Sequence, residues 1–146
     1  MNGDGIEGLR VRIGPWSEVA EGCSSIRQDV FIKEQGVPES IEMDGKDGDA
    51  VHVLASVSGQ AVGTGRMLAD GKIGRMAVLQ PFRKAGIGGA MLALLLEEAR
   101  ERGLSSVYLN AQVGALRFYE DFGFCAVGDE FVEAGIRHRR MELSLA

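Results

Sequence analysis

Residues 83–90 read Arg83-Lys84-Ala85-Gly86-Ile87-Gly88-Gly89-Ala90 and open the most helix-like stretch of the chain. The first backbone N–H groups of a helix have no partner inside the helix, and together with the helix dipole they form a site for anions. Gly86, Gly88 and Gly89 carry no Cβ atom, so the main chain can approach a diphosphate, with Arg83 and Lys84 beside it as counter-charges. Glycines before a helix also occur as simple tight turns, and their spacing alone does not separate the two interpretations.

Two familiar phosphate-binding loops are excluded by the letters that follow these glycines. A P-loop needs Lys and then Ser or Thr directly after its last glycine, but Gly88 is followed by Gly89 and Ala90. A dinucleotide fingerprint needs a third glycine three residues after the second, but Gly88 leads to Met91 and Gly65 leads to Leu68. The sequence therefore predicts an anion site of another kind.

The length and composition fit one domain spanning residues 1–146, with 45% hydrophobic and 25% charged residues. No apolar run approaches the roughly 20 residues that span a bilayer, and residues 1–8, which lack the pattern of a secretory signal, are interpreted as a frayed end. Cys23 and Cys125 have the spacing of neither a zinc site nor a disulfide framework. We therefore expect a cytoplasmic protein with no metal and no membrane partner.

The net charge of −5 disfavours nucleic-acid binding, which depends on clustered Lys and Arg. The densest basic run is Arg137-His138-Arg139-Arg140. Side chains in a strand alternate between its two faces, so this run is interpreted as a solvated strand edge and not as a binding site.

Hydrophobic periodicity predicts helices and strands along the whole chain. The expected strands are residues 9–13, 51–56, 61–68, 72–78, 106–111, 125–132 and 136–145, and the expected helices are residues 17–34, 86–102 and 115–122. Ser17 is expected to cap the first helix, and the acid-rich residues 39–49 are expected to form a surface loop. The last strand, residues 136–145, is expected to be exposed and available to pair across a homodimer.

The order of these elements decides the direction of the strands. Ser58-Gly59 and Asp70-Gly71 are hairpin turns, which make the middle strands antiparallel. A helix separates strand 72–78 from strand 106–111, so that pair is expected to be parallel. We predict an α/β (α+β) fold with a mixed, mostly antiparallel central sheet of about six or seven strands, flanked by helices.

The strand, glycine turn, long helix and strand, followed by Phe118-Tyr119-Glu120-Asp121-Phe122-Gly123-Phe124, resemble the GNAT superfamily of acyl-CoA-dependent N-acetyltransferases. The turn is similar to the superfamily's acetyl-CoA motif, in which Gln or Arg is followed by two residues, Gly, one residue, and Gly or Ala. The resemblance covers most of the chain. Residues Val30-Phe31-Ile32-Lys33-Glu34-Gln35-Gly36-Val37-Pro38 also resemble the small bacterial ElaA-like branch, whose members mostly have no assigned substrate.

The resemblance implies a site for acetyl-CoA as co-substrate. The pantetheine arm would lie along Met76, Ala77 and Val78, with the Val78 amide polarising the thioester carbonyl. Asn110 and Gln112 would bond pantetheine or an ordered water, although many members carry Asn where Gln112 stands. The pyrophosphate would lie on the amides of Arg83, Lys84, Ala85, Gly86, Ile87, Gly88 and Gly89.

Tyr119 corresponds to the general acid that protonates the departing thiolate, whereas the family does not fix the position of the general base. Glu34, Glu42, Asp44 and His52 are candidates, and the carboxylates of Glu42 and Asp44 come first because they would also attract a cationic amine. We therefore expect an N-acetyltransferase that moves the acetyl group directly from acetyl-CoA to a primary amine of a small molecule or peptide. The alternative is a module of the same fold that binds acyl-CoA as a sensor or interaction partner without turnover.

Overall fold

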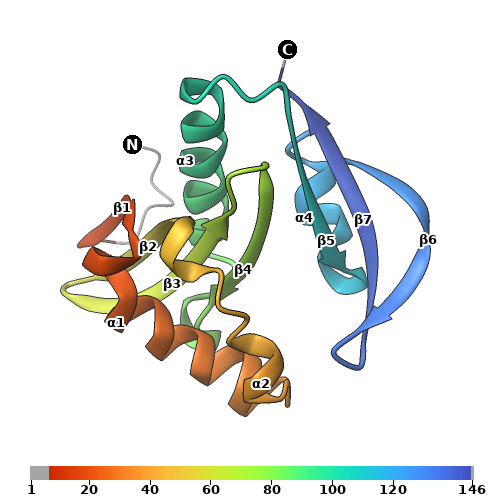
Figure 1. Cartoon of the computed structure of the whole chain (residues 1–146). Helices are drawn as coiled ribbons and strands as arrows, with labels where there is room; N and C mark the ends of the chain where they lie inside the picture. Colours follow the sequence, from red (N-terminus) through yellow and green to blue (C-terminus); the bar gives the residue numbers. More distant parts are fainter. Residues whose placement is uncertain (1–6, 146) are drawn as a thin grey trace.

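A computed structural model describes residues 7–145, in which seven strands form one sheet in the order β1-β2-β3-β4-β5-β7-β6 (Figure 1). The pair β4 and β5 is parallel and the other neighbouring pairs are antiparallel, so the predicted mixed, mostly antiparallel sheet is confirmed. The strands are β1 (Leu9–Pro15), β2 (Val51–Val57), β3 (Gln60–Met67), β4 (Lys72–Val78), β5 (Ser106–Gln112), β6 (Cys125–Glu133) and β7 (Ile136–Ser144). The frayed end expected for residues 1–8 lies mostly outside the described residues.

Two helices cover opposite faces of this sheet (Figure 1). On α3 (Ile87–Glu101), Met91, Leu95 and Ala99 follow one another at intervals of four residues, and all three are buried against the sheet. On the other face, α1 (Trp16–Arg27) buries Cys23 and Ile26. The short helix α4 (Leu116–Glu120) joins the α3 side of the core through Tyr119.

The first helix differs in detail from its prediction. It begins at Trp16, with Pro15 at the N-cap position, and Ser17 makes no capping bond. Pro15 has no polar side chain that could accept from the free N–H groups of the first turn, so the helix starts without a side-chain cap. A π-helical segment, η1 (Gln28–Glu34), continues the helix to the predicted end before Gly36, which has φ +73°.

The middle strands form the predicted meander. Ser58 and Gly59 connect β2 to β3 with φ values of +49° and +87°, as a two-residue hairpin turn requires. Gly71 connects β3 to β4 with φ +96°.

The sheet opens between β4 and β5. Their parallel pairing is limited to Lys72 with Tyr108 and Ile73 with Leu109, and beyond these pairs the two strands diverge (Figure 1). At the same point β4 carries a bulge, because the register with β3 shifts and Arg75 has φ +54°. The main-chain groups of the second half of β4 are therefore left without a strand partner on the β5 side.

One expectation about the fold is wrong, and a second is only partly confirmed. The strand β7 lies between β5 and β6, so it is not an exposed edge that could pair across a dimer; β1 and β6 are the edges. The reason is that the final hairpin folds back with its second strand next to β5. Residues 39–49 lie at the surface as expected, with only Glu42 buried and Asp47 half-buried, but they are not an irregular loop: they contain α2 (Glu39–Glu42) and a 3₁₀ turn, η2 (Asp47–Asp49), and Glu42 is enclosed by arginines.

Two further short 3₁₀ turns, η3 (Gln80–Phe82) and η4 (Val113–Ala115), precede α3 and α4. Within residues 7–145 no helix has the length and apolar character that crossing a membrane requires.

Candidate active site

A pocket of about 540 Å³, here called the turn pocket, lies where β4 leads into the glycine turn and α3. It is lined by Met76, Ala77, Val78, Phe82, Arg83, Lys84, Gly86, Ile87, Gly88, Gly89, Met91, Ala115, Phe118 and Tyr119. These include the predicted cofactor residues of β4 and of the turn, with the exception of Ala85. Asn110 and Gln112, predicted to face the same ligand, do not line this pocket.

The glycine turn presents unpaired amides to the turn pocket. Gly86 is the N-cap of α3 with φ +84°, and the first helical bond runs from the Ala90 N–H to the Gly86 oxygen. In the described part of the chain, the N–H groups of Ile87, Gly88 and Gly89 therefore have no acceptor. Three adjacent donors at the positive end of a 15-residue helix are suited to an anion.

Arg83 is not a free counter-charge in this structure. Its guanidinium forms two 2.7 Å hydrogen bonds with the Glu34 carboxylate, and its Nε donates to the Val78 oxygen at 2.8 Å. The hydrogen bonds from Arg83 lower the pKa of the Glu34 carboxyl. Because this ion pair is exposed, it contributes little to stability, and an anionic ligand can compete for the guanidinium.

Val78 turns its main-chain groups toward the opening between the strands. The neighbouring Leu79 N–H donates to the Val62 oxygen at 2.9 Å, on the β3 side. Successive residues of a strand point their N–H and C=O groups to opposite sides, so those of Val78 point away from β3. The bond from Arg83 to the Val78 oxygen agrees with this direction.

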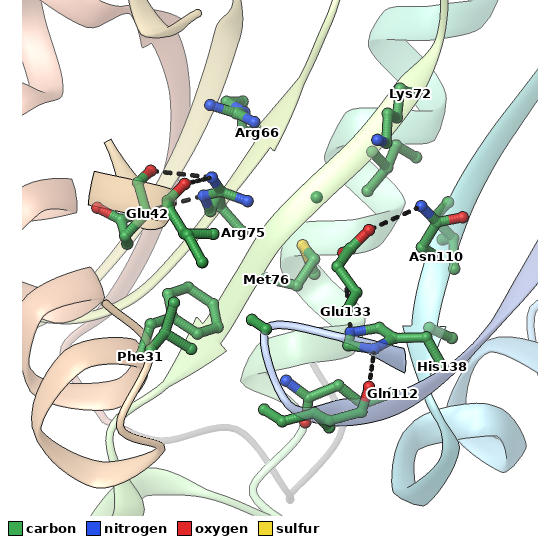
Figure 2. Close-up of a pocket in the computed structure, with 18 of the residues that line it drawn as sticks. Phe31, Glu42, Arg66, Lys72, Arg75, Met76, Asn110, Gln112, Glu133 and His138 are labelled. Atoms are coloured by element: carbon green, nitrogen blue, oxygen red, sulfur yellow. Dashed lines mark hydrogen bonds and ion pairs between the residues drawn. The ribbon is translucent and has the colours of Figure 1, made fainter. Parts of the chain in front are cut away.

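A second pocket, of about 400 Å³ and here called the sheet pocket, occupies the space between the diverging strands (Figure 2). Its polar lining residues are Gln35, Glu42, Asp44, Lys46, Arg66, Lys72, Arg75, Asn110, Gln112, Glu133 and His138. Side chains alternate along β5, so Asn110 and Gln112 are only half-buried here, whereas Leu109 and Ala111, which also border the pocket, are buried in the core. The Asn110 amide lies 3.5 Å from Glu133 Oε1, and the Gln112 amide donates to Gln35 Oε1 at 3.0 Å.

Tyr119 lies between the two pockets. It lines both of them, as do Met76 and Ala115. Its ring packs edge-on against Phe118 and Phe124, with centroids 4.9 and 5.8 Å away, and the residue is 8% exposed. Burial raises the pKa of Tyr119 to about 12, and no hydrogen bond contributes to the shift, so the hydroxyl is a neutral donor at physiological pH.

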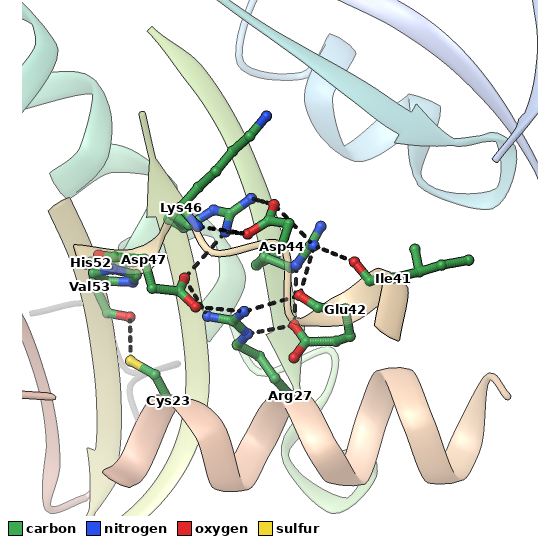
Figure 3. Close-up of polar contacts among 11 residues, drawn as sticks. Cys23, Arg27, Ile41, Glu42, Asp44, Lys46, Asp47, His52 and Val53 are labelled. Carbon is green, nitrogen blue, oxygen red and sulfur yellow. Dashed lines mark hydrogen bonds and ion pairs between the residues drawn. The ribbon is translucent and has the colours of Figure 1, made fainter. Parts of the chain in front are cut away.

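An ion-pair cluster forms one wall of the sheet pocket. Arg27, Arg66 and Arg75 face the carboxylates of Glu42, Asp44 and Asp47, and Arg27 lies only 2.6 Å from Glu42 and 2.8 Å from Asp47 (Figure 3). Each of the three carboxylates contacts two guanidinium groups. This cluster ties Glu42, Asp44 and Asp47 of the acid-rich segment to the rest of the protein, although most of residues 39–49 are exposed.

The cluster decides the state of the predicted base candidates. Partial burial alone would raise the pKa of the Asp44 carboxyl, but hydrogen bonds from Arg66 and the Lys46 N–H outweigh it, so the pKa lies well below the usual value. Glu42 is buried and bonded to Arg27 and Arg75. Glu42 and Asp44 both line the sheet pocket, but both carboxylates form ion pairs with arginines.

The other two base candidates lie outside both pockets. Glu34 is held by Arg83 on the surface. His52 is 0% exposed, and burial lowers its pKa; its Nε2 lies 3.0 Å from the Asp47 oxygen, and its ring packs 4.8 Å from that of Trp16.

Six charged or titratable groups of the sheet pocket were not predicted as site residues from the sequence, namely Lys46, Arg66, Lys72, Arg75, Glu133 and His138. The run 137–140, interpreted as a solvated edge, divides between the two faces of β7. Arg137 is exposed beside Glu130, whereas His138 is 6% exposed and faces the pocket. The alternation of the strand was a usable signal, but which face the sheet covers could not be known until β7 was placed beside β5.

Comparison with known proteins gives matches over most of the chain. A family model described as an acetyltransferase (GNAT) domain matches residues 17–145. YjcF of Bacillus subtilis strain 168, an uncharacterized N-acetyltransferase, is 38% identical over 120 residues, which cover 80% of this chain and 86% of YjcF.

Solved structures agree with the sequence matches. The crystal structure of Escherichia coli ElaA superposes with a TM-score of 0.82 at 29% identity, covering 91% of this chain and 98% of ElaA. That of an acyl-CoA N-acyltransferase from Pseudomonas aeruginosa superposes with a TM-score of 0.81, also at 29% identity, covering 92% of this chain and 98% of the other. Both resemblances stated from the sequence are thus confirmed.

Proposed function

The chain belongs to the GNAT acetyltransferase family, and on that premise we propose that it transfers an acetyl group from acetyl-CoA directly to a primary amine of a small molecule or peptide. One observation carries the proposal. The turn pocket and the sheet pocket are separate along most of their length but share Met76, Ala115 and Tyr119. A cofactor in the first pocket and an amine in the second would meet at these residues.

The turn pocket suits coenzyme A at both of its ends. The amides of Ile87, Gly88 and Gly89 would receive the pyrophosphate, with Lys84 beside them. Because β5 leaves the second half of β4 unpaired, the main-chain groups of this segment that point away from β3, at Met76 and Val78 on either side of Ala77, would bond the pantetheine arm as an added strand would, with the Val78 oxygen giving up its bond from Arg83. In the sheet pocket, the Asn110 and Gln112 side chains would bond the acyl end of the cofactor or a water beside it.

The chemistry would proceed where the pockets meet. The Val78 N–H points to the opening and would polarise the thioester carbonyl as attack places negative charge on its oxygen; one such donor is typically worth about 2.7 to 4 kcal/mol in the transition state. The Tyr119 hydroxyl would donate to the sulfur as the C–S bond breaks.

Direct transfer is favoured over a covalent enzyme intermediate by the positions of the two cysteines. Cys23 is fully buried on the inner face of α1, where burial raises the pKa of its thiol, and Cys125 is exposed on the edge strand β6. Neither lines the turn pocket or the sheet pocket. A nucleophilic cysteine would have to reach the thioester, and these two do not.

The identity of the base is a separate question. Glu42 and Asp44 line the sheet pocket and stay candidates, but either would have to give up its arginine bonds before it could accept a proton. The low pKa of Asp44 also makes it a weak base at neutral pH.

A screen of primary amines tests the function. The purified protein is incubated with acetyl-CoA and a library of amines, and free thiol is measured with a chromogenic reagent. The proposal expects at least one amine to raise thiol release well above hydrolysis, with the acetylated amine detected by mass spectrometry. A protein that binds acetyl-CoA with a thermal shift but releases no thiol with any amine would instead be a binding module.

A further inference from the structure

We propose that His138 is the general base of this site and that its Nε2 removes a proton from the acceptor's ammonium group, beside the carboxylate of Glu133. The inference rests on the proposed function and adds a residue to it. It is carried by three features of His138, namely its fixed tautomer, its place in the sheet pocket and its charged neighbour.

The tautomer follows from one short hydrogen bond. The His138 Nδ1 lies 2.7 Å from the main-chain oxygen of Ile136. A carbonyl oxygen can only accept, so Nδ1 must carry the hydrogen of the neutral ring. The lone pair of the neutral imidazole is therefore on Nε2, which is the atom that a base needs free.

The position of the ring is fixed by its neighbours on three strands. On β7, His138 lies opposite Gln112 of β5, and its ring stacks on Phe131 of β6 with centroids 5.8 Å apart and planes inclined by 20°. His138 is 6% exposed and lines the sheet pocket, as Gln112 and Glu133 also do (Figure 2). A base held in this way keeps its orientation between turnovers.

The charged group nearest to the lone pair on His138 Nε2 is the carboxylate of Glu133. Glu133 Oε2 lies 3.9 Å from His138 Nε2, which is too long for a hydrogen bond. A carboxylate at this distance attracts an incoming ammonium group and stabilises the imidazolium that forms when the proton moves. The other charged residues of the pocket are Glu42, Asp44, Lys46, Arg66, Lys72 and Arg75, and of these the two acids are paired with arginines.

The proton transfers and bond changes of the proposed reaction balance without another reactant. His138 Nε2 takes one ammonium proton, and the freed lone pair forms the C–N bond to the thioester carbonyl carbon. The adduct collapses, the C–S bond breaks with its electron pair on sulfur, and the Tyr119 hydroxyl protonates the thiolate. The nitrogen's remaining extra proton restores Tyr119, and the imidazolium releases its proton to water.

The tautomer can be tested without any acceptor. The chain has two histidines, so a long-range ¹H–¹⁵N spectrum of the wild-type protein shows two imidazole rings, and His138→Gln assigns the missing one. We expect His138 as the Nδ1–H tautomer, and His52, whose Nε2 faces the Asp47 oxygen, as the Nε2–H tautomer. An Nε2–H tautomer for His138 would overturn the assignment.

The catalytic role is tested by the pH dependence of kcat/KM with an alkyl amine found in the screen. Loss of a general base typically costs about 10²- to 10⁴-fold. For His138→Gln we expect a loss in this range near neutral pH that shrinks as the pH approaches about 10, because a growing fraction of an alkyl amine then arrives neutral. The dissociation constant of acetyl-CoA should change less than twofold, and Arg137→Gln, on the outer face of the same strand, should behave as wild type.

Two results would overturn the inference. One is a His138→Gln variant that keeps kcat/KM within threefold of wild type at neutral pH, and the other is a loss of equal size at every pH, which would indicate a structural role. Wild-type protein that acetylates no amine would refute the proposed function, and with it the role of His138. An active wild type with an equally active His138→Gln would refute the role of His138 alone.

Discussion

Replacing Tyr119 by Phe removes a single oxygen from the point where the two pockets meet. The structure sets the size of the expected effect. The pKa of Tyr119 is raised to about 12 by burial, whereas an ordinary thiol has a pKa of about 8.5. Complete transfer of the phenolic proton to the free thiolate is thus uphill by about 3.5 pKa units, or about 5 kcal/mol. Tyr119 is therefore expected to give its proton to the sulfur only while the C–S bond breaks and the nitrogen's remaining extra proton replaces it, so that no free tyrosinate accumulates.

Removal of a donor that acts only in the transition state costs about 2.7 to 4 kcal/mol, or about 10²- to 10³-fold in kcat. We expect a loss of this size for Tyr119→Phe, with the KM for acetyl-CoA changed less than threefold. The fold should be unaffected, because no hydrogen bond to another residue contributes to the state of this hydroxyl. Thiol release at saturating amine measures kcat, and thermal unfolding measures the stability.

The other tyrosine of the chain supplies a matched control. The Tyr108 hydroxyl donates to Asp70, and Tyr108 lines neither pocket. Tyr108→Phe should keep wild-type kcat. The reasoning is refuted if Tyr119→Phe turns over within threefold of wild type, or if its defect lies in the KM for acetyl-CoA.

Three further predictions concern the turn and the ion-pair cluster. Gly86→Val forces a β-branched residue to φ +84°, so it should weaken coenzyme A binding, measured by calorimetry, by at least tenfold, or about 1.4 kcal/mol. The control Gly103→Val, at φ +77° beyond the other end of α3, should lose stability but keep its affinity for coenzyme A. Arg27→Met removes a guanidinium partner from Glu42 and Asp47 and should lower the free energy of unfolding, measured in urea, by about 3 to 5 kcal/mol. Arg117→Met, on the exposed surface, should change the free energy of unfolding little, and equal effects of the two variants would contradict the burial of the cluster. The pKa values of Asp44 and Asp47 are lower in the folded protein than in the unfolded chain, so their ionised forms stabilise the fold above the unfolded pKa, and this stabilisation is lost as the pH falls below it. The Tm should therefore drop below about pH 4, and the drop should be smaller in Asp44→Asn.

Local patterns predicted most of the elements. The alternation of strand residues, the spacing of apolar residues on α3 and the Ser58-Gly59 turn each depend on a few neighbouring residues, and the structure has all three. The glycine turn could also be predicted from the sequence, because positive φ at Gly86 and free amides at a helix start are properties of a short segment.

Contacts between residues far apart in the sequence could not be predicted in this way. The acid-rich segment was interpreted as a surface loop without ion-pair partners, because Arg27, Arg66 and Arg75 are 15 to 33 residues away from the acids they contact. The place of β7 between β5 and β6 is decided by sheet pairing and not by the letters of the strand. The position of His138 in the sheet pocket follows from that pairing, so the histidine was overlooked for the same reason.

A crystal structure of the protein with coenzyme A tests most directly whether the two pockets form one reaction site. We expect the pyrophosphate on the amides of Ile87, Gly88 and Gly89, the pantetheine arm along the free side of β4, and the sulfur beside Tyr119. Coenzyme A bound away from the turn, or with its sulfur outside the junction of the two pockets, would contradict the account.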